Sequence, residues 1–147
     1  MYGDPEVMRK HAGRLREQSG DLRALADQLV SRTESLHWTG RAAEAMRDRV
    51  QDRATRLREV AARHETAAVS LEVHLAEVEA LKDAIAATER RADLLVTEAR
   101  TRMARADDEG GVRAADPADR VLVDFEPPAP GHKDWLAVTL PGLRGPA

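Results

Sequence analysis

The chain has 147 residues, no cysteine, and only 3% aromatic side chains, which excludes disulfides and thiolate metal sites and favours helices that meet along narrow seams over a thick core. Charged residues make up 33% of the chain but leave a net charge of only −3, so neither sign dominates and no nucleic-acid partner is expected. No apolar run exceeds four residues, far short of the roughly 20 that a membrane span needs.

A first helix is predicted over about residues 4–36. Asp4 is a suitable N-cap and Pro5 suits the first helical position. Leucines recur every seven residues and predict one apolar stripe along the helix: Leu15, Leu22, Leu29 and Leu36. Gly13 and Gly20 interrupt this run of good helix formers, and we expect them to mark a close approach to another helix.

A second, much longer helix is predicted over about residues 41–107. Neither glycine nor proline occurs between Arg41 and Glu109, and apolar residues follow one another in steps of three and four. At ~1.5 Å per residue this helix would be roughly 100 Å long. A kink near residues 88–91, where the apolar stripe thins, is the alternative to a straight helix.

The short turn at residues 37–40 predicts that the two helices form an antiparallel hairpin. Counting outward from this turn sets Leu29 against Val50, Leu22 against Leu57, and Leu15 near His64. We expect the Trp38 ring to close the hairpin over Leu36 and Met46, and Gly40 to adopt backbone angles that other residues resist. A partly exposed Trp38 with only a packing role is the alternative.

Beyond about His74 the second helix outruns the first, yet its apolar stripe continues. Leaving this stripe in water would forfeit several kcal/mol at ~25 cal/mol per Å², so we expect a partner to cover it. The predicted partner-binding seam consists of Leu75, Val78, Leu81, Ile85, Leu95 and Met103. An antiparallel homodimer, forming a coiled-coil-like four-helix bundle, is the simplest arrangement, and a heterodimer with another helical hairpin is the next.

The net charge differs between the first part of the chain and the distal part of the second helix. Residues 1–64 hold 13 basic and 10 acidic side chains, whereas residues 65–107 hold 6 and 9. A basic first part and an acidic second part would favour antiparallel self-association or docking to a related chain.

The remaining residues, 108–147, are predicted to be an irregular or disordered tail. Residues 121–125 could form one strand, but no second strand is evident to pair with it, and five prolines follow. The tail is expected to have no core of its own and to act as a solubilising segment. The alternative is a docking segment with apolar anchors at Val121, Val123, Phe125, Trp135 and Leu136.

No motif in the chain indicates catalysis. A glycine-rich phosphate loop, a GxSxG elbow and an HExxH pair are all missing from the sequence. His64 and His74 lie ten residues apart and do not share a helical face, and a seam position predicts a buried, hydrogen-bonded His64. We therefore expect no enzyme, no catalytic residue, no metal site and no cofactor.

Two long helices joined by Trp38-Thr39-Gly40 resemble the WXG family, the ESAT-like helical hairpins of type VII secretion in actinobacteria and firmicutes. The resemblance covers about residues 4–100, and the Arg- and Ala-rich composition looks actinobacterial. It implies an all-α hairpin that forms four-helix homodimers or heterodimers and acts by binding. Trp38 and Gly40 match the family's turn, whereas its export motif is not found after the second helix; the one tyrosine, Tyr2, precedes the first helix.

Two functions follow as hypotheses. The first is a non-catalytic interaction protein of a type VII secretion-like system, acting as a secreted substrate, a co-secreted partner or a chaperone, with the secretion machinery or a toxin as further partners. The second is a cytoplasmic coiled-coil scaffold or adaptor unrelated to secretion. The first 30 residues lack a signal-peptide core, so we expect a cytoplasmic protein or one exported by a type VII-like route.

Overall fold

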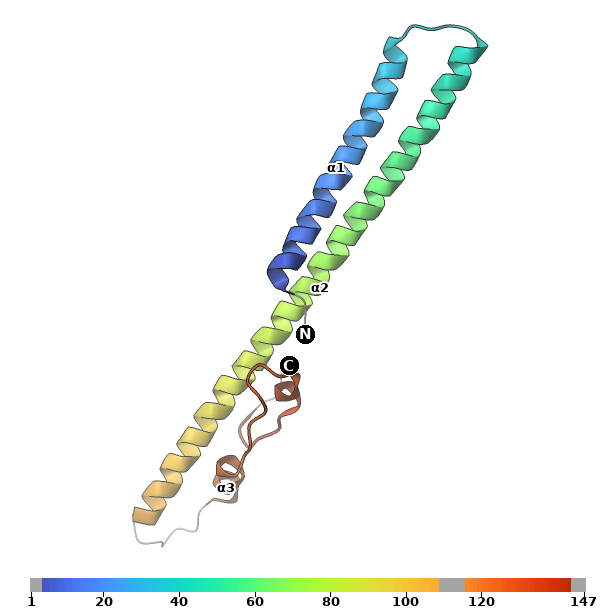
Figure 1. Cartoon of the computed structure of the whole chain (residues 1–147). Helices are drawn as coiled ribbons and strands as arrows, with labels where there is room; N and C mark the ends of the chain where they lie inside the picture. Colours follow the sequence, from blue (N-terminus) through green and yellow to red (C-terminus); the bar gives the residue numbers. More distant parts are fainter. Residues whose placement is uncertain (1–3, 109–115, 144–147) are drawn as a thin grey trace. The chain divides into compact units, whose positions relative to one another are not determined.

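The computed structural model describes residues 4–108 and 116–143, and this part of the chain is helical, with no strand. Figure 1 shows α1 (Pro5–Ser35), the long α2 (Arg41–Asp108) and the short α3 (Pro117–Val123); a 3₁₀ helix, η1, covers Lys133–Ala137. The prediction of an all-helical chain with a long second helix is confirmed. None of the described helices combines the length and hydropathy needed to span a bilayer.

The chain divides into two compact units, which meet within α2. The two-helix unit ends at Glu77, and the distal unit begins at Val78 and continues to the C-terminus. The sequence placed the boundary at residue 107 instead, because the tail was expected to stand apart from α2.

Local sequence signals account for the helix bounds. The Asp4 side chain accepts a hydrogen bond from the backbone N–H of Glu6 at 2.9 Å, and Pro5 occupies the first turn. α2 continues without interruption from Arg41 to Asp108, including residues 88–91, where a kink was the alternative.

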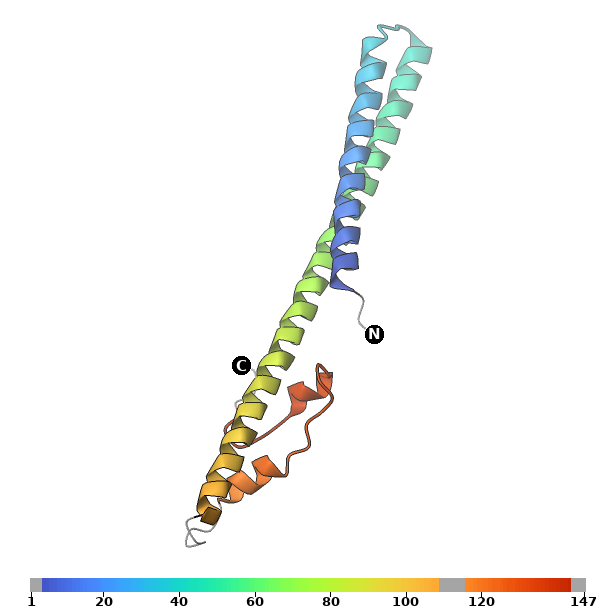
Figure 2. The ribbon, with the colours of Figure 1, turned by 60° about the vertical axis from the view of Figure 1, so that its left-hand side comes forward.

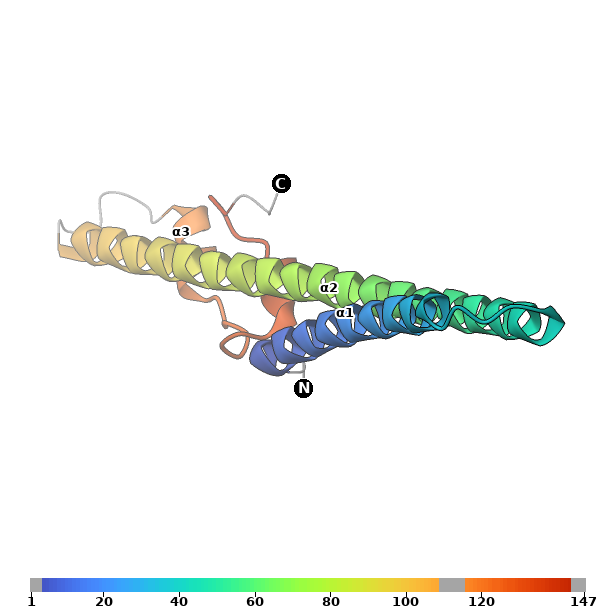
Figure 3. The ribbon, with the colours of Figure 1, turned by 90° about the horizontal axis from the view of Figure 1, so that it is seen from above.

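In the two-helix unit, α1 and the first part of α2 lie side by side and run in opposite directions, as Figure 2 and Figure 3 show. Ion pairs fix which residues face each other. Arg16 bonds to Glu65 at 2.8 Å and to Glu72 at 2.6 Å, and Arg58 bonds to Asp27 at 2.7 Å. The predicted register, which set Leu15 near His64, is therefore wrong by nearly one heptad. The middle of a loop does not determine the register; the side chains that fit between the helices do.

Small side chains fill the seam between the two helices. In α1 the buried residues are Ala12, Ser19 and Ala26, and in α2 they include Ala54, Ala61 and Ala68. Both sets recur every seven residues, and small side chains allow two helices to approach closely. Leucine was expected at this position, but Leu15, Leu22 and Leu29 are half-buried beside the seam, and Leu36 is 46% exposed.

Gly13 and Gly20 do not mark a contact with α2. A Cβ atom built on either residue would meet nothing within 4 Å, and both residues are exposed. The seam uses Ala12 and Ser19 at the neighbouring positions instead.

The distal unit contains a core to which the tail contributes. Residues of α2 pack against three buried side chains of the tail, namely Leu122, Trp135 and Leu140. The expectation that the Pro-rich end has no core is therefore wrong. The irregular structure expected for the tail, and the strand that residues 121–125 could have formed, are replaced by α3: Asp116 caps this helix by accepting from the Ala118 N–H at 2.9 Å, and Pro117 occupies its first turn.

Candidate functional site

The seam of the two-helix unit has two sides of different chemistry. One side carries the ion pairs of Arg16 and Arg58. The other carries large side chains that are apolar except for one histidine, and we call it the leucine face; its members are Met8, Leu15, Leu22 and Leu29 of α1 and Val50, Leu57, His64 and Leu71 of α2. All of them are half-buried.

Helix geometry explains why the two sides separate. At about 100° per residue, a residue three positions after a seam alanine is rotated by about 60° to one side, and a residue four positions after it by about 40° to the other. Leu57 and His64 fall in the first group, whereas Arg58 and Glu65 fall in the second. The seam alanines are therefore flanked by the leucine face on one side and by ions on the other.

On the ion-paired side, the charged side chains of Arg16 and Glu72 stabilise each other's charged forms. Hydrogen bonding to Arg16 lowers the pKa of Glu72, and the same hydrogen bond, with the charges of Glu72 and Glu65, raises the pKa of Arg16. These side chains are between a third and a half exposed, so the pairs contribute little to the stability of the fold.

The leucine face extends beyond the half-buried side chains. Leu25 and Val60 are exposed and border it, and a hollow of about 380 Å³ is lined by Leu29, Leu57, Val60, Arg53 and Arg56. Because this hollow joins side chains of α1 and α2, both helices contribute to one apolar surface. The sequence predicted these apolar positions. It also predicted that the leucines of the first helix would be covered by the apolar residues of the second, whereas they remain half-buried.

Trp38 lies in the connection between α1 and α2 and is 58% exposed. The prediction that its ring closes the unit over Leu36 and Met46 is wrong, since those residues are 46% and 40% exposed. Two helices alone offer no further side chains at this end to enclose an indole. The Trp38 carbonyl accepts a hydrogen bond from Arg47, and Gly40 has φ of +101°, as its predicted role requires.

The predicted partner-binding seam is mostly covered within the chain itself. Leu75, Val78, Ile85 and Leu95 are buried, Met103 is half-buried, and only Leu81 is exposed. Ile85 and Leu95 belong to the core to which Trp135 and Leu140 contribute. Gly142, at φ +81°, approaches so closely that a Cβ there would lie 3.3 Å from a Leu95 methyl carbon. The buried residues of this stripe are therefore already covered by the chain itself and do not require a partner to cover them.

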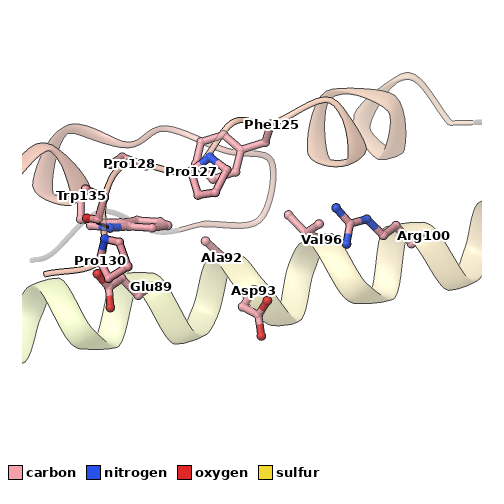
Figure 4. A pocket seen from close by; sticks show the side chains of 11 residues that line it. Glu89, Ala92, Asp93, Val96, Arg100, Phe125, Pro127, Pro128, Pro130 and Trp135 are labelled. Atoms are coloured by element: carbon pink, nitrogen blue, oxygen red, sulfur yellow. Dashed lines mark hydrogen bonds between the residues drawn. The ribbon is translucent and has the colours of Figure 1, made fainter. Parts of the chain in front are cut away.

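A cavity of about 600 Å³ lies in the distal unit between α2 and the tail (Figure 4). Trp135, Phe125 and prolines of the tail form one wall, and Ala92 and Val96 of α2 form the opposite one. The Trp135 indole N–H donates to the Ala129 carbonyl at 3.1 Å, and the Phe125 and Trp135 rings meet edge to face at 6.1 Å. At one end the Glu89 carboxylate accepts a hydrogen bond from the Gly131 N–H. The tail side of the lining is aromatic and prolyl, whereas α2 adds the charged side chains of Glu89, Asp93 and Arg100. The hydrogen bonds of Trp135 and Glu89 hold the tail in place.

A second polar contact holds the tail on α2. Arg102 bonds to both carboxylate oxygens of buried Asp119, at distances of 2.6 to 3.1 Å. This bidentate geometry is the strong form of an ion pair. Hydrogen bonding to Arg102 lowers the pKa of Asp119, and the reciprocal bond raises the pKa of Arg102.

The lowered pKa predicts how acid will affect the tail. An unfolded Asp takes up its proton near pH ~3.9, whereas folded Asp119 takes it up at a lower pH, so its stabilising contribution is complete above pH ~3.9 and is lost as the pH falls through the folded value. Asp119→Asn should lower the stability of the distal unit at neutral pH and weaken the acid dependence. Trp135 fluorescence, followed against pH and denaturant in a Trp38→Phe background, measures both effects. Exposed Asp124 provides the control Asp124→Asn; equal behaviour of the two variants would contradict the prediction.

Two buried polar atoms of the two-helix unit lack a hydrogen-bond partner: Ser19 Oγ and His64 Nδ1. The expectation of a hydrogen-bonded His64 is therefore wrong at this atom. Among the described residues, no group of three or more His, Asp or Glu side chains could hold a metal ion.

Comparison with protein-family models, with curated proteins and with solved structures found no match. The residues and their geometry are therefore the basis on which a function is proposed.

Proposed function

We propose that this chain is a non-catalytic protein–protein interaction protein whose two-helix unit is a helical hairpin that binds another helical chain. The observation that carries the proposal is the leucine face, a row of half-buried apolar side chains that continues along both helices. Exposed Leu25 and Val60 widen this row. Contiguous apolar surface of this kind is typical of interaction sites, and two further helices would complete a four-helix bundle.

Trp38 supports a more specific proposal. A large, exposed indole two residues before Gly40 resembles the turn of the WXG family, in which the turn tryptophan lies near the export motif of a partner. We therefore propose that the protein acts in a type VII secretion-like system, as a substrate, a co-secreted partner or a chaperone.

The first experiment tests the interaction itself. Leu22→Lys with Leu57→Lys places two charges on the leucine face, and Val69→Lys with Val73→Lys places the same two charges at exposed apolar positions on other sides of α2. We expect the first pair to abolish association with helical partners, measured by sedimentation and light scattering of the full chain, and the second pair to leave association intact. Equal effects of the two pairs, or no association of the unmodified chain with any helical partner, would contradict the proposal.

The second experiment tests the link to secretion. In an actinobacterial host with a type VII system, the full chain should reach the culture filtrate only when the membrane ATPase of that system is present. Export without the ATPase, or complete retention together with unchanged export of every other substrate when the chain is deleted, would favour a scaffold unrelated to secretion.

A further inference from the structure

The leucine face is bordered on its α2 side by arginines. The residues that follow the face around α2 are Arg49, Arg53, Arg56 and Arg63; the nearest carboxylates, Asp52 and Glu59, lie beyond these arginines as seen from the leucine face. Measured around the axis from the seam alanines, these arginines lie at about 180° to 260°, next to the leucine face at about 260° to 320°. The carboxylates of the same stretch lie at about 0° to 160°, where they face the ion-paired side or solvent.

These guanidinium groups are available to a partner. Within the described part of the chain none of the four has a carboxylate within ion-pair distance, in contrast to Arg16 and Arg58 on the other side of the seam. Arg53 and Arg56 line the same hollow as Leu29 and Leu57, so charge and apolar surface belong to one site.

The α1 border has a similar but weaker charge. Arg14 and Arg32 lie there together with a single carboxylate, Asp21. The whole border thus holds six arginines against one aspartate, although residues 1–64 as a whole hold 13 basic and 10 acidic side chains. The excess of positive charge at this border arises because most acidic side chains of the two helices lie on other sides of the helices.

We infer that the leucine face binds an amphipathic helix whose apolar stripe is bordered by Asp and Glu, and that it does not bind a second copy of this chain. The inference rests on the proposed interaction function and names the chemistry of the partner. A second copy would bring six more arginines and only one carboxylate, Asp21, to the interface. Like charges across an interface oppose association, whereas opposite charges increase the rate of encounter and select the partner.

Two synthetic peptides test the charge preference on the full chain. Both are helical and share one leucine stripe, and the residues that border the stripe are Glu in one peptide and Lys in the other. By fluorescence anisotropy we expect the Glu peptide to bind roughly tenfold more tightly at low salt. The difference should shrink as salt shortens the screening length from ~10 Å at ~0.1 M toward ~3 Å at ~1 M.

Charge-reversed variants locate the effect. Arg53→Glu with Arg56→Glu changes the border from six arginines and one carboxylate to four arginines and three carboxylates, and should therefore remove most of the preference between the two peptides. Arg23→Glu with Arg41→Glu makes the same change of net charge away from the leucine face and should preserve the preference, with helicity by circular dichroism confirming that both variants fold.

The failures of the two proposals differ. Equal binding of both peptides would contradict the inference that the partner is acidic, and so would a homodimer that Leu22→Lys with Leu57→Lys disrupts. Either result would remain consistent with the proposed interaction function. Absence of binding to either peptide, together with a monomeric chain that no helical protein engages, would overturn both.

Discussion

Trp135→Ala is expected to destabilise the distal unit by about 3–5 kcal/mol, the range for truncating a large buried aromatic side chain. Trp135 is 6% exposed and belongs to the same core as Leu95 and Leu122, so its loss removes apolar contacts and leaves a cavity. It also removes the indole donor to the Ala129 carbonyl and the edge-to-face contact with Phe125. Hydrogen exchange should show a loss of protection over residues 116–143, with residues 4–77 unchanged.

The chain offers a matched control for this change, because its other tryptophan is exposed. Trp38→Ala deletes the same atoms from a side chain that is 58% exposed. It should change the free energy of unfolding by less than about 0.5 kcal/mol, as surface substitutions do. If the proposed role of Trp38 holds, this variant loses partner binding while keeping its stability. Equal protection of residues 116–143 in the two variants would show that Trp135 does not hold the tail on α2.

Ala61→Leu is expected to destabilise the two-helix unit by about 1–3 kcal/mol, because it forces extra carbon atoms into a packed seam. Ala61 is fully buried, and the residues of α1 that fill the same seam are the equally small Ser19 and Ala26. A leucine there must push the helices apart, which also strains the ion pairs of Arg16 and Arg58. Chemical denaturation and hydrogen exchange of residues 4–77 measure the effect.

The neighbouring residue provides the control. Ala62 is exposed, and Ala and Leu have similar helix propensities, so Ala62→Leu should leave the stability within about 0.5 kcal/mol of the unmodified chain. A stable Ala61→Leu variant would mean that the helices can separate at no cost. In that case the small residues would not determine their spacing.

The sequence predicted the two long helices well, though not α3, because helix signals are local. Asp4, Pro5 and the absence of glycine and proline from α2 act within a few residues, and the observed helix bounds agree with them. The register of α1 against α2 was predicted less well. The leucines repeat every seven residues, but so do the small residues beside them, and only the packed structure shows which of the two sets forms the seam.

The candidate site was predicted in part for the same reason. The sequence indicated an interaction protein and located the apolar stripe of α2, but it assigned the partner-binding surface to residues beyond His74. In the structure most of those residues are buried, Ile85 and Leu95 in a core shared with the tail. In the two-helix unit, a row of partly accessible apolar side chains forms the leucine face, with its border of arginines. The arginines of that border, Arg49, Arg53, Arg56 and Arg63, could be placed next to the apolar stripe from the sequence, although other arginines of α2, such as Arg58, lie on the ion-paired side.

The sequence by itself determined that this chain is helical, where its long helices begin and end, and which of their residues are apolar, since each of these properties depends on neighbours a few positions away. The tertiary structure alone decided which apolar residues are covered. The contacts that hold the tail join residues far apart in the chain, such as Arg102 with Asp119 and Glu89 with Gly131. Their formation depends on a chain reversal and on shape complementarity, and no periodicity of the sequence encodes either.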